Sequence, residues 1–310
     1  DRRVMLQYLL YLLAAPAALW LATYFLPLLL VTLKPVPNLK TKYGAEWALV
    51  TGGSSGIGRA IVNSLAMQKL NIVIVAIDDD LLKSTMAELK SQFPNQEFRS
   101  VGCYFSPGGD YLEKVVKACD DIDVQLIFNN AGYIVTSFYH ASSQTAQMNN
   151  LECNLTAPCK ITLHFLQKMR EKSLKGAFVY TSSVSGYIPN PFAVMYGTTK
   201  AGLSQFAASL ACEVMAKGID VTVIHPSPVA SNFYNNLAKI DALEMARKTA
   251  VSADTLPAVI FQSIGWFVQR DVGMAAMIVR VVVSCCSYNF LSVVFGMGAP
   301  LSGDYKRHDK

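Results

Sequence analysis

The chain of 310 residues is long enough for one large α/β domain with additional segments, and 52% of its residues are hydrophobic, above the usual range for a soluble protein. The formal net charge is +5 and the basic residues are dispersed, which excludes a nucleic-acid-binding stripe with interleaved aromatic side chains. Seven cysteines occur without CxxC or Cys/His ligand spacing, which argues against a structural metal or a disulfide framework and for a reducing compartment.

Residues 1–33 are predicted to form a transmembrane anchor. No charged side chain occurs from Val4 to Leu33, and this run exceeds the roughly 20 residues that cross the hydrocarbon layer of a bilayer. Pro16 and Pro27 are expected to bend or break the helix. A cleaved signal peptide is disfavoured by the length of the run, and a buried helix is disfavoured because it need not be apolar on every face.

A proline-containing linker, residues 34–43, precedes a domain predicted over residues 44–270. Its first strand pattern, Trp47 to Val50, leads into a glycine-rich turn and an amphipathic helix. The glycines permit a tight turn and close approach to a pyrophosphate, whose charge the N–H groups at the helix N-terminus would stabilise. We therefore predict a dinucleotide site that includes Thr51, Gly52, Ser54, Ser55, Gly56, Ile57 and Gly58.

The second strand pattern, Ile72 to Ile77, ends where a dinucleotide-binding domain selects its cofactor. An acidic residue at this point bonds the ribose of NAD, whereas an arginine accommodates the phosphate of NADP. Asp78 and the two aspartates after it would repel that phosphate, and Arg59 would attract it. The alternative for these aspartates is a solvated turn that caps the next helix. The charges favour NAD(H) slightly, and the choice between NAD and NADP stays open.

Four more buried-type strand patterns follow, at Phe98 to Tyr104, Leu126 to Phe128, Gly176 to Thr181 and Val221 to Ile224. Strands of this type that alternate with helices predict an α/β fold, a Rossmann-type doubly wound parallel sheet with its site at the carboxyl edge. Residues 232–270 are expected to form a loop-like substrate lid.

Tyr196 and Lys200 are four residues apart in a helical pattern, so they lie on one face, one turn apart. Ketone reduction needs a hydride from a nicotinamide and a proton, and Tyr196 is a suitable general acid when a neighbouring cation favours its phenolate. Ser183, thirteen residues upstream, could hold the carbonyl oxygen. An isolated pair of this kind is more often an ordinary helix face, but Ser183 and the glycine-rich turn favour catalysis.

Together these motifs resemble the short-chain dehydrogenase/reductase family over about residues 44–235. The glycine-rich turn matches its TGxxxGxG motif, and the later matches, in order, are Asn129-Asn130-Ala131-Gly132, Asn154, Ser183, and Tyr196 with Lys200. The resemblance implies that Lys200 also binds the nicotinamide ribose and that Asn154 keeps a water between Lys200 and solvent. It further implies NAD(P)(H) contacts from Asn130, Ala131, Gly132, Pro226 and Val229.

Three positions depart from the family pattern. Tyr104 stands where the family carries an adenine-contacting aspartate, Ser227 replaces the glycine after Pro226, and Ser231 replaces a threonine. Because a residue other than glycine restricts the backbone, we expect an altered contact to the nicotinamide carboxamide.

Residues 271–310 are predicted to be an apolar, membrane-associated extension with a polar tail. Arg280 interrupts the apolar stretch from Val272 to Ala299. An arginine in mid-span is costly unless it pairs or reaches the surface. An interfacial or re-entrant helix, or a packed helix pair, is therefore expected in place of a second clean span.

The apolar ends and the Tyr43-Gly44-Ala45-Glu46-Trp47 segment resemble the membrane-bound subgroup of very-long-chain 3-oxoacyl-CoA reductases and 17β-hydroxysteroid dehydrogenases. This resemblance implies an endoplasmic-reticulum oxidoreductase for long apolar ketones or alcohols. Two alternatives stay open: another lipid-handling member, such as a retinol or 3-ketosphinganine reductase, and a catalytically weak or inactive member that serves as a structural subunit. The expected partners are a lipid-like small molecule, the membrane, and either a second copy of the chain or the subunits of a membrane complex.

Overall fold

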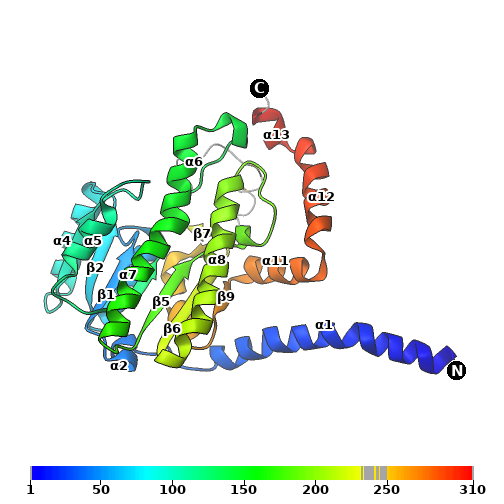
Figure 1. Ribbon diagram of the computed structural model, residues 1–310, viewed down its shortest axis with the longest axis horizontal. Helices are drawn as coiled ribbons and strands as arrows, with labels where there is room; N and C mark the ends of the chain where they lie inside the picture. The colour runs from blue at the N-terminus through cyan, green and yellow to red at the C-terminus, as the bar shows by residue number, and fades with distance from the viewer. Residues whose placement is uncertain (1, 232, 234–240, 242–243, 245–249, 309–310) are drawn as a thin grey trace.

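The computed structural model describes residues 2–231, 233, 241, 244 and 250–308 (Figure 1). At its centre lies a parallel sheet with the strand order β3-β2-β1-β4-β5-β6-β9. The strands are β1 (Trp47–Thr51), β2 (Asn71–Ala76), β3 (Phe98–Gly102), β4 (Val124–Asn129), β5 (Gly176–Thr181), β6 (Ile219–Pro226) and β9 (Gln269–Val272). The order reverses between β1 and β4, and such a switch point opens a crevice at the carboxyl ends of the strands. The predicted doubly wound fold is confirmed.

Helices cover both faces of the sheet, which is why every residue of β1, β4 and β5 is buried. One face carries α3 (Gly56–Met67), α4 (Asp80–Gln92) and α10 (Leu256–Ser263). The other carries α5 (Tyr111–Ala118), α7 (Ala157–Glu171) and α8 (Val194–Val214). The two apolar cores therefore fix the strand ends at which the site is built.

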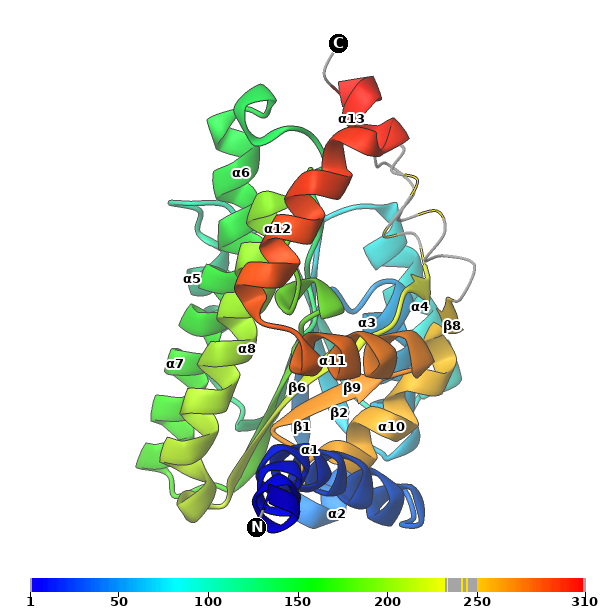
Figure 2. The same ribbon diagram turned by 90° about the vertical axis from the view of Figure 1, so that its right-hand side faces the viewer.

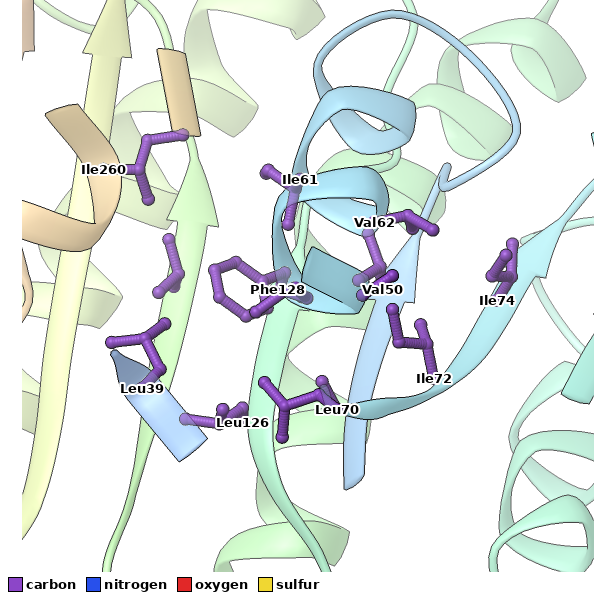
Figure 3. Packing of buried hydrophobic residues seen from close by; sticks show 14 of the residues in the cluster. Leu39, Val50, Ile61, Val62, Leu70, Ile72, Ile74, Leu126, Phe128 and Ile260 are labelled. Carbon is purple, nitrogen blue, oxygen red and sulfur yellow. The ribbon is translucent and has the colours of Figure 1, made fainter. Parts of the chain in front are cut away.

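Part of the predicted linker belongs to the first of these cores. Helix α2 (Leu39–Tyr43) ends at Gly44, whose φ of 63° lies in the left-handed region that favours glycine. Leu39 is fully buried, and Figure 3 shows it in the same cluster as Leu126 and Phe128 of β4. A short helix packed into the core thus leads from the N-terminal helix into the domain.

The predicted lid also contains core structure. Ile260 and Phe261 of α10 are buried, and β9 pairs with β6 as an edge strand of the sheet. The lid prediction is therefore wrong for residues 256–270, and most of residues 232–249 lie outside the described part of the chain. Because β9 extends to Val272, the predicted boundary at 270/271 falls inside a strand.

The N-terminal segment forms one unbroken helix, α1 (Arg2–Thr32), which continues through Pro16 and Pro27. Ala14–Thr32 is long and apolar enough to cross a membrane, and 6% of it is buried. Leu28 and Val31 are 8% and 2% exposed, so one face near the C-terminal end of α1 packs on the domain. Figure 1 shows the rest of the helix extending away from the domain, and Figure 2 views the same helix nearly end-on, with its N-terminus toward the viewer.

The apolar C-terminal stretch forms two helices, α11 (Met274–Cys285) and α12 (Tyr288–Gly298), with a bend of 113° between them. The stretch is therefore bent and does not form one straight helix, as expected from the position of Arg280. Figure 1 shows α1 and α11 extending from the same side of the domain, with α12 turned across that side. The chain then continues into α13 (Gly303–His308), where Tyr305 packs against Phe138 with ring centroids 5.1 Å apart.

Candidate active site

The glycine-rich turn joins β1 to α3 at the carboxyl edge of the sheet. Gly52 and Gly56 have φ values of 67° and 52°, in the region where larger residues are strained. At Gly58 a Cβ atom would lie 2.1 Å from the carbonyl oxygen of Gly52, so α3 can approach the turn this closely only with glycine there. The N-terminus of α3 is thereby presented to the crevice, as a dinucleotide phosphate requires.

Thr51 ties this turn to the loop after β4. Its hydroxyl oxygen accepts hydrogen bonds from the backbone N–H groups of Asn130 and Ala131, each at 3.0 Å. The Asn130 amide donates to the Thr51 carbonyl at 3.2 Å and accepts from the Thr181 hydroxyl at 3.1 Å. Thr51 is 1% exposed. Thr51 and Asn130 together therefore connect the ends of β1, β4 and β5.

Lys200 is buried at the centre of the site. Its ammonium group donates to the carbonyl oxygen of Thr181 at 2.8 Å and lies 5.6 Å from the centroid of the Tyr196 ring. Burial lowers the pKa of Lys200 to about 8. A Cβ at Gly132 would lie 3.3 Å from the ammonium nitrogen and 3.0 Å from Asn154 Oδ1, so glycine there allows these groups to gather.

Asn154 lies in a π-helical turn, Glu152–Thr156, between α6 (Gln144–Leu151) and α7. Such turns insert a residue into a helix and are frequent at functional sites. The Asn154 side chain accepts from the Tyr133 N–H at 3.0 Å and donates to the Tyr133 carbonyl at 2.9 Å. It also donates to the Thr199 hydroxyl at 3.2 Å. These bonds fix the asparagine beside Lys200.

A cavity of about 870 Å³ occupies the crevice. Twelve of the residues predicted for the site line it: Gly52, Ser55, Gly56, Ile57, Asn130, Ala131, Gly132, Ser183, Tyr196, Lys200, Pro226 and Val229. Thr51, Gly58 and Asn154 support this lining from behind, and Ser54 and Asp78 lie outside it. The lining also includes four apolar residues of the C-terminal extension: Ala275 and Val279 of α11 and Val294 and Phe295 of α12. Sequence patterns did not identify these four apolar residues as part of the site.

Ser227 faces the C-terminal extension. Its hydroxyl oxygen accepts from the backbone N–H of Ala276 in α11 at 3.0 Å, and its own N–H donates to the carbonyl of Val272 at 2.7 Å. A Cβ at Gly273 would lie 2.5 Å from the Ser227 oxygen. The substitution that departs from the family pattern thus anchors the start of α11, a role that only the pairing of β9 with β6 reveals.

At the end of β2 the aspartates have separate positions. Asp79 caps α4, since its carboxylate accepts from the Leu82 N–H at 2.9 Å. The capping alternative therefore applies to Asp79, whereas Asp78 is exposed beside Gly102 of β3. Arg59 pairs with Glu88 at 2.9 Å. Because Glu88 already neutralises the charge of Arg59, we expect Arg59 to attract the 2′-phosphate of NADP less strongly than the sequence alone suggests.

The family model for short chain dehydrogenases matches residues 46–241 of the chain. This protein belongs to the short-chain dehydrogenase/reductase family. It is an NAD(P)-dependent oxidoreductase, and the glycine turn described above fits a nicotinamide dinucleotide.

The chain is 30% identical over 240 residues to a very-long-chain 3-oxoacyl-CoA reductase-like protein of Arabidopsis thaliana, an alignment that covers 76% of this chain and 73% of that protein. It is 31% identical to a very-long-chain 3-oxoacyl-CoA reductase of Mus musculus, over 66% of this chain and 65% of that protein. Among solved structures, a 7β-hydroxysteroid dehydrogenase superimposes with a TM-score of 0.74 at 22% identity and covers 84% of this chain and 100% of its own. At 22% identity the superposition establishes the fold alone.

Replacing Tyr196 by phenylalanine removes the hydroxyl that would donate the proton. We expect turnover to fall by about two orders of magnitude or more, while the affinity for dinucleotide stays nearly the same. Steady-state kinetics and cofactor titration measure the two effects. Tyr139→Phe, at a residue 51% exposed, is the control. Unaltered turnover in Tyr196→Phe would remove this residue from the mechanism.

The buried ammonium of Lys200 predicts a pH dependence. Its pKa of about 8 in the folded protein lies below the value of 10.5 for an exposed lysine. Above pH 8 the ammonium is lost, so kcat/KM should fall about tenfold per pH unit. Between pH 8 and pH 10.5 the unfolded chain binds more protons at this lysine than the folded protein does. The contribution of Lys200 to the free energy of unfolding therefore becomes less unfavourable as the pH rises. A value of kcat/KM that stays constant from pH 8 to pH 10.5 would contradict the role assigned to the Lys200 ammonium.

Asp78 is predicted to set the cofactor preference. With Arg59 paired to Glu88, NAD(H) should bind no worse than NADP(H), and Asp78→Ala should shift preference toward NADP(H) by removing a negative charge near the 2′-phosphate. Energy transfer from protein to reduced nicotinamide measures both affinities. Asp80→Ala removes a neighbouring charge that already pairs with Lys83 and should change little. A strong NADPH preference in the unmodified protein would disprove the prediction.

Proposed function

We propose that this protein is a membrane-anchored reductase that transfers a hydride from a nicotinamide cofactor to the keto group of a long-chain 3-oxoacyl-CoA. The observation that carries the proposal is the mixed lining of the cavity. Ser183, Tyr196 and Lys200 line it together with apolar residues of α11 and α12. A polar reacting group and a long apolar chain would each have a matching surface. The similarity to very-long-chain 3-oxoacyl-CoA reductases supports the same substrate class.

The residues of the site have distinct roles in this proposal. The bound cofactor supplies the hydride. Ser183 donates a hydrogen bond to the substrate carbonyl oxygen, and Tyr196 transfers its proton to that oxygen as negative charge develops. Lys200 holds a positive charge beside Tyr196 and favours the phenolate that remains. Asn154 fixes the position of the loop next to Lys200 through its two bonds to Tyr133.

The alternative, an inactive structural subunit, was suggested by Tyr104 and Ser227. Tyr104 is 68% exposed and stands outside the cavity lining, and Ser227 bonds to α11. Neither residue blocks the groups proposed for catalysis. Active reduction is therefore the favoured function.

We assign the protein to a membrane through α1 and the bent pair α11 and α12. Exposed apolar side chains on the pair include Met274, Ile278, Val282, Phe290, Val293 and Met297. In this arrangement α1 crosses the bilayer and the pair lies against it, close to the cavity that α11 and α12 help to form. The endoplasmic reticulum is the proposed compartment, because these segments resemble those of the membrane-bound subgroup.

The function is tested by cofactor oxidation with purified full-length protein in detergent or nanodiscs. We expect consumption of long-chain 3-oxoacyl-CoA and much slower consumption of acetoacetyl-CoA, which lacks the apolar chain. The Tyr196→Phe protein serves as the inactive control. Reduction of a steroid ketone without reduction of the acyl-CoA would replace the proposed substrate, and inactivity with both would favour a structural role.

Carbonate extraction tests the anchor. The length and apolar surface of α1 predict that the intact chain stays with native membranes at alkaline pH. A deletion of residues 2–20 shortens the helix below a spanning length and should increase release. Recovery of the unmodified chain in the supernatant would rule out a spanning helix.

A further inference from the structure

A buried polar cluster lies where the N-terminal helix meets the domain. Its centre is Asp271 at the end of β9, which is 4% exposed. One carboxylate oxygen accepts from the Tyr24 hydroxyl of α1 at 2.9 Å and from Arg280 Nε of α11 at 3.0 Å. The other accepts from the Tyr187 hydroxyl at 2.9 Å. One carboxylate therefore joins the membrane helix, the C-terminal extension and the loop after Ser183.

Arg280, the charged residue that interrupts the apolar stretch, has several partners in this cluster. Its guanidinium lies over the Tyr187 ring, 3.6 Å from the centroid, and bonds to the Tyr187 hydroxyl. It also donates to the Gln269 side chain at 3.1 Å. A charge on an apolar helix is tolerated when it is paired and hydrogen-bonded in this way. Arg280 is thus directed inward, toward the loop that carries Ser183.

Tyr187 connects the cluster to that loop. Ser183 begins a short helical turn, η3 (Val184–Gly186), and its side chain accepts from the Ser185 N–H. The N–H of Tyr187 closes the turn by donating to the carbonyl of Val184 at 2.9 Å. The position of the Tyr187 ring therefore constrains the turn that starts at Ser183.

A second path leads from Tyr187 to Lys200. The Tyr187 ring packs on His225, with centroids 4.5 Å apart. His225 Nε2 lies 2.8 Å from the Ser204 hydroxyl, which lies 2.8 Å from the Lys200 carbonyl oxygen. Burial, with the nearby charges of Arg280 and Lys200, lowers the pKa of His225 well below its ordinary value, so the ring stays neutral. His225 is then a hydrogen-bonding spacer in this path.

We infer that Tyr24, Asp271, Arg280 and Tyr187 are positioning residues that couple the docking of α1 to the geometry of Ser183 and Lys200. The inference rests on the proposed catalytic site. Tyr24 is its most informative member, because its hydroxyl reaches the cluster from a helix outside the domain. Removal of that hydroxyl deletes one bond to a buried carboxylate, while Leu28 and Val31 still hold α1 on the domain.

The first test is Tyr24→Phe in full-length protein in nanodiscs, with Tyr11→Phe on the exposed face of the same helix as control. Tyr11 is 70% exposed. We expect Tyr24→Phe to lower kcat about tenfold with unchanged KM, cofactor affinity and membrane retention. Tyr11→Phe should match the unmodified protein. Unchanged kcat in Tyr24→Phe, or equal losses in both variants, would overturn the inference.

Hydrogen exchange provides a readout independent of the substrate. Tyr24→Phe should speed exchange of the amides of Gly186 and Tyr187, which close the turn after Ser183, and leave β1 and β4 unchanged. A uniform increase would indicate general destabilisation and overturn the positioning role. If the unmodified protein does not reduce ketones but this local change occurs, the proposed function fails and the coupling stands.

Pairwise coupling and a conservative variant complete the test. Because Tyr24 and Tyr187 share one carboxylate, Tyr24→Phe combined with Tyr187→Phe should speed exchange of the Gly186 amide no more than Tyr187→Phe alone. Arg280→Lys should retain most of the local protection that Arg280→Met loses, since it keeps a charge beside Asp271. Additive effects of the two tyrosines would show that they act separately, contrary to the inference.

Discussion

The buried ammonium of Lys200 is the constraint on which the site depends. A charge removed from water is costly unless other groups surround it with hydrogen bonds or opposite charge. Here the ammonium donates a hydrogen bond to the Thr181 carbonyl, and both Lys200 and Asn154 approach Gly132 closely. Each partner comes from a different element, so β5, the π-helical turn and α8 must all be in register before the ammonium is accommodated. The geometry of the candidate site therefore depends on the fold of the central sheet.

The same dependence explains why the glycine turn, the Asn130 loop and the end of β5 form one unit. Thr51 and Thr181 both bond to Asn130, so the cofactor crevice and the Lys200 partner share a side chain. These partly buried bonds, 3.0 to 3.2 Å long, join the ends of three strands, so the loss of one partner would leave a polar group of the network without its hydrogen bond. The network therefore holds the glycine turn and the Thr181 carbonyl, which accepts from Lys200, in a fixed relation.

The C-terminal extension completes the site in a way that the central domain cannot. Ser227 fixes the start of α11, and α11 and α12 contribute apolar residues to the lining of the cavity. The Asp271 carboxylate binds α1 to the same extension. The apolar segments at the two ends of the chain, α1 and the pair α11 and α12, therefore also support or line the candidate site.

The sequence by itself determined the doubly wound fold, the apolar N-terminal helix and the residues gathered around Tyr196, because buried strands, glycine turns and helix spacing are local patterns. It did not reveal that Leu39, Ile260 and β9 belong to the core, since short segments acquire that role only through distant packing. The predicted lid failed for this reason. The partners of Arg280 and Ser227 were likewise decided by tertiary structure alone, because hydrogen bonds between residues far apart in the chain leave no periodic signal in it.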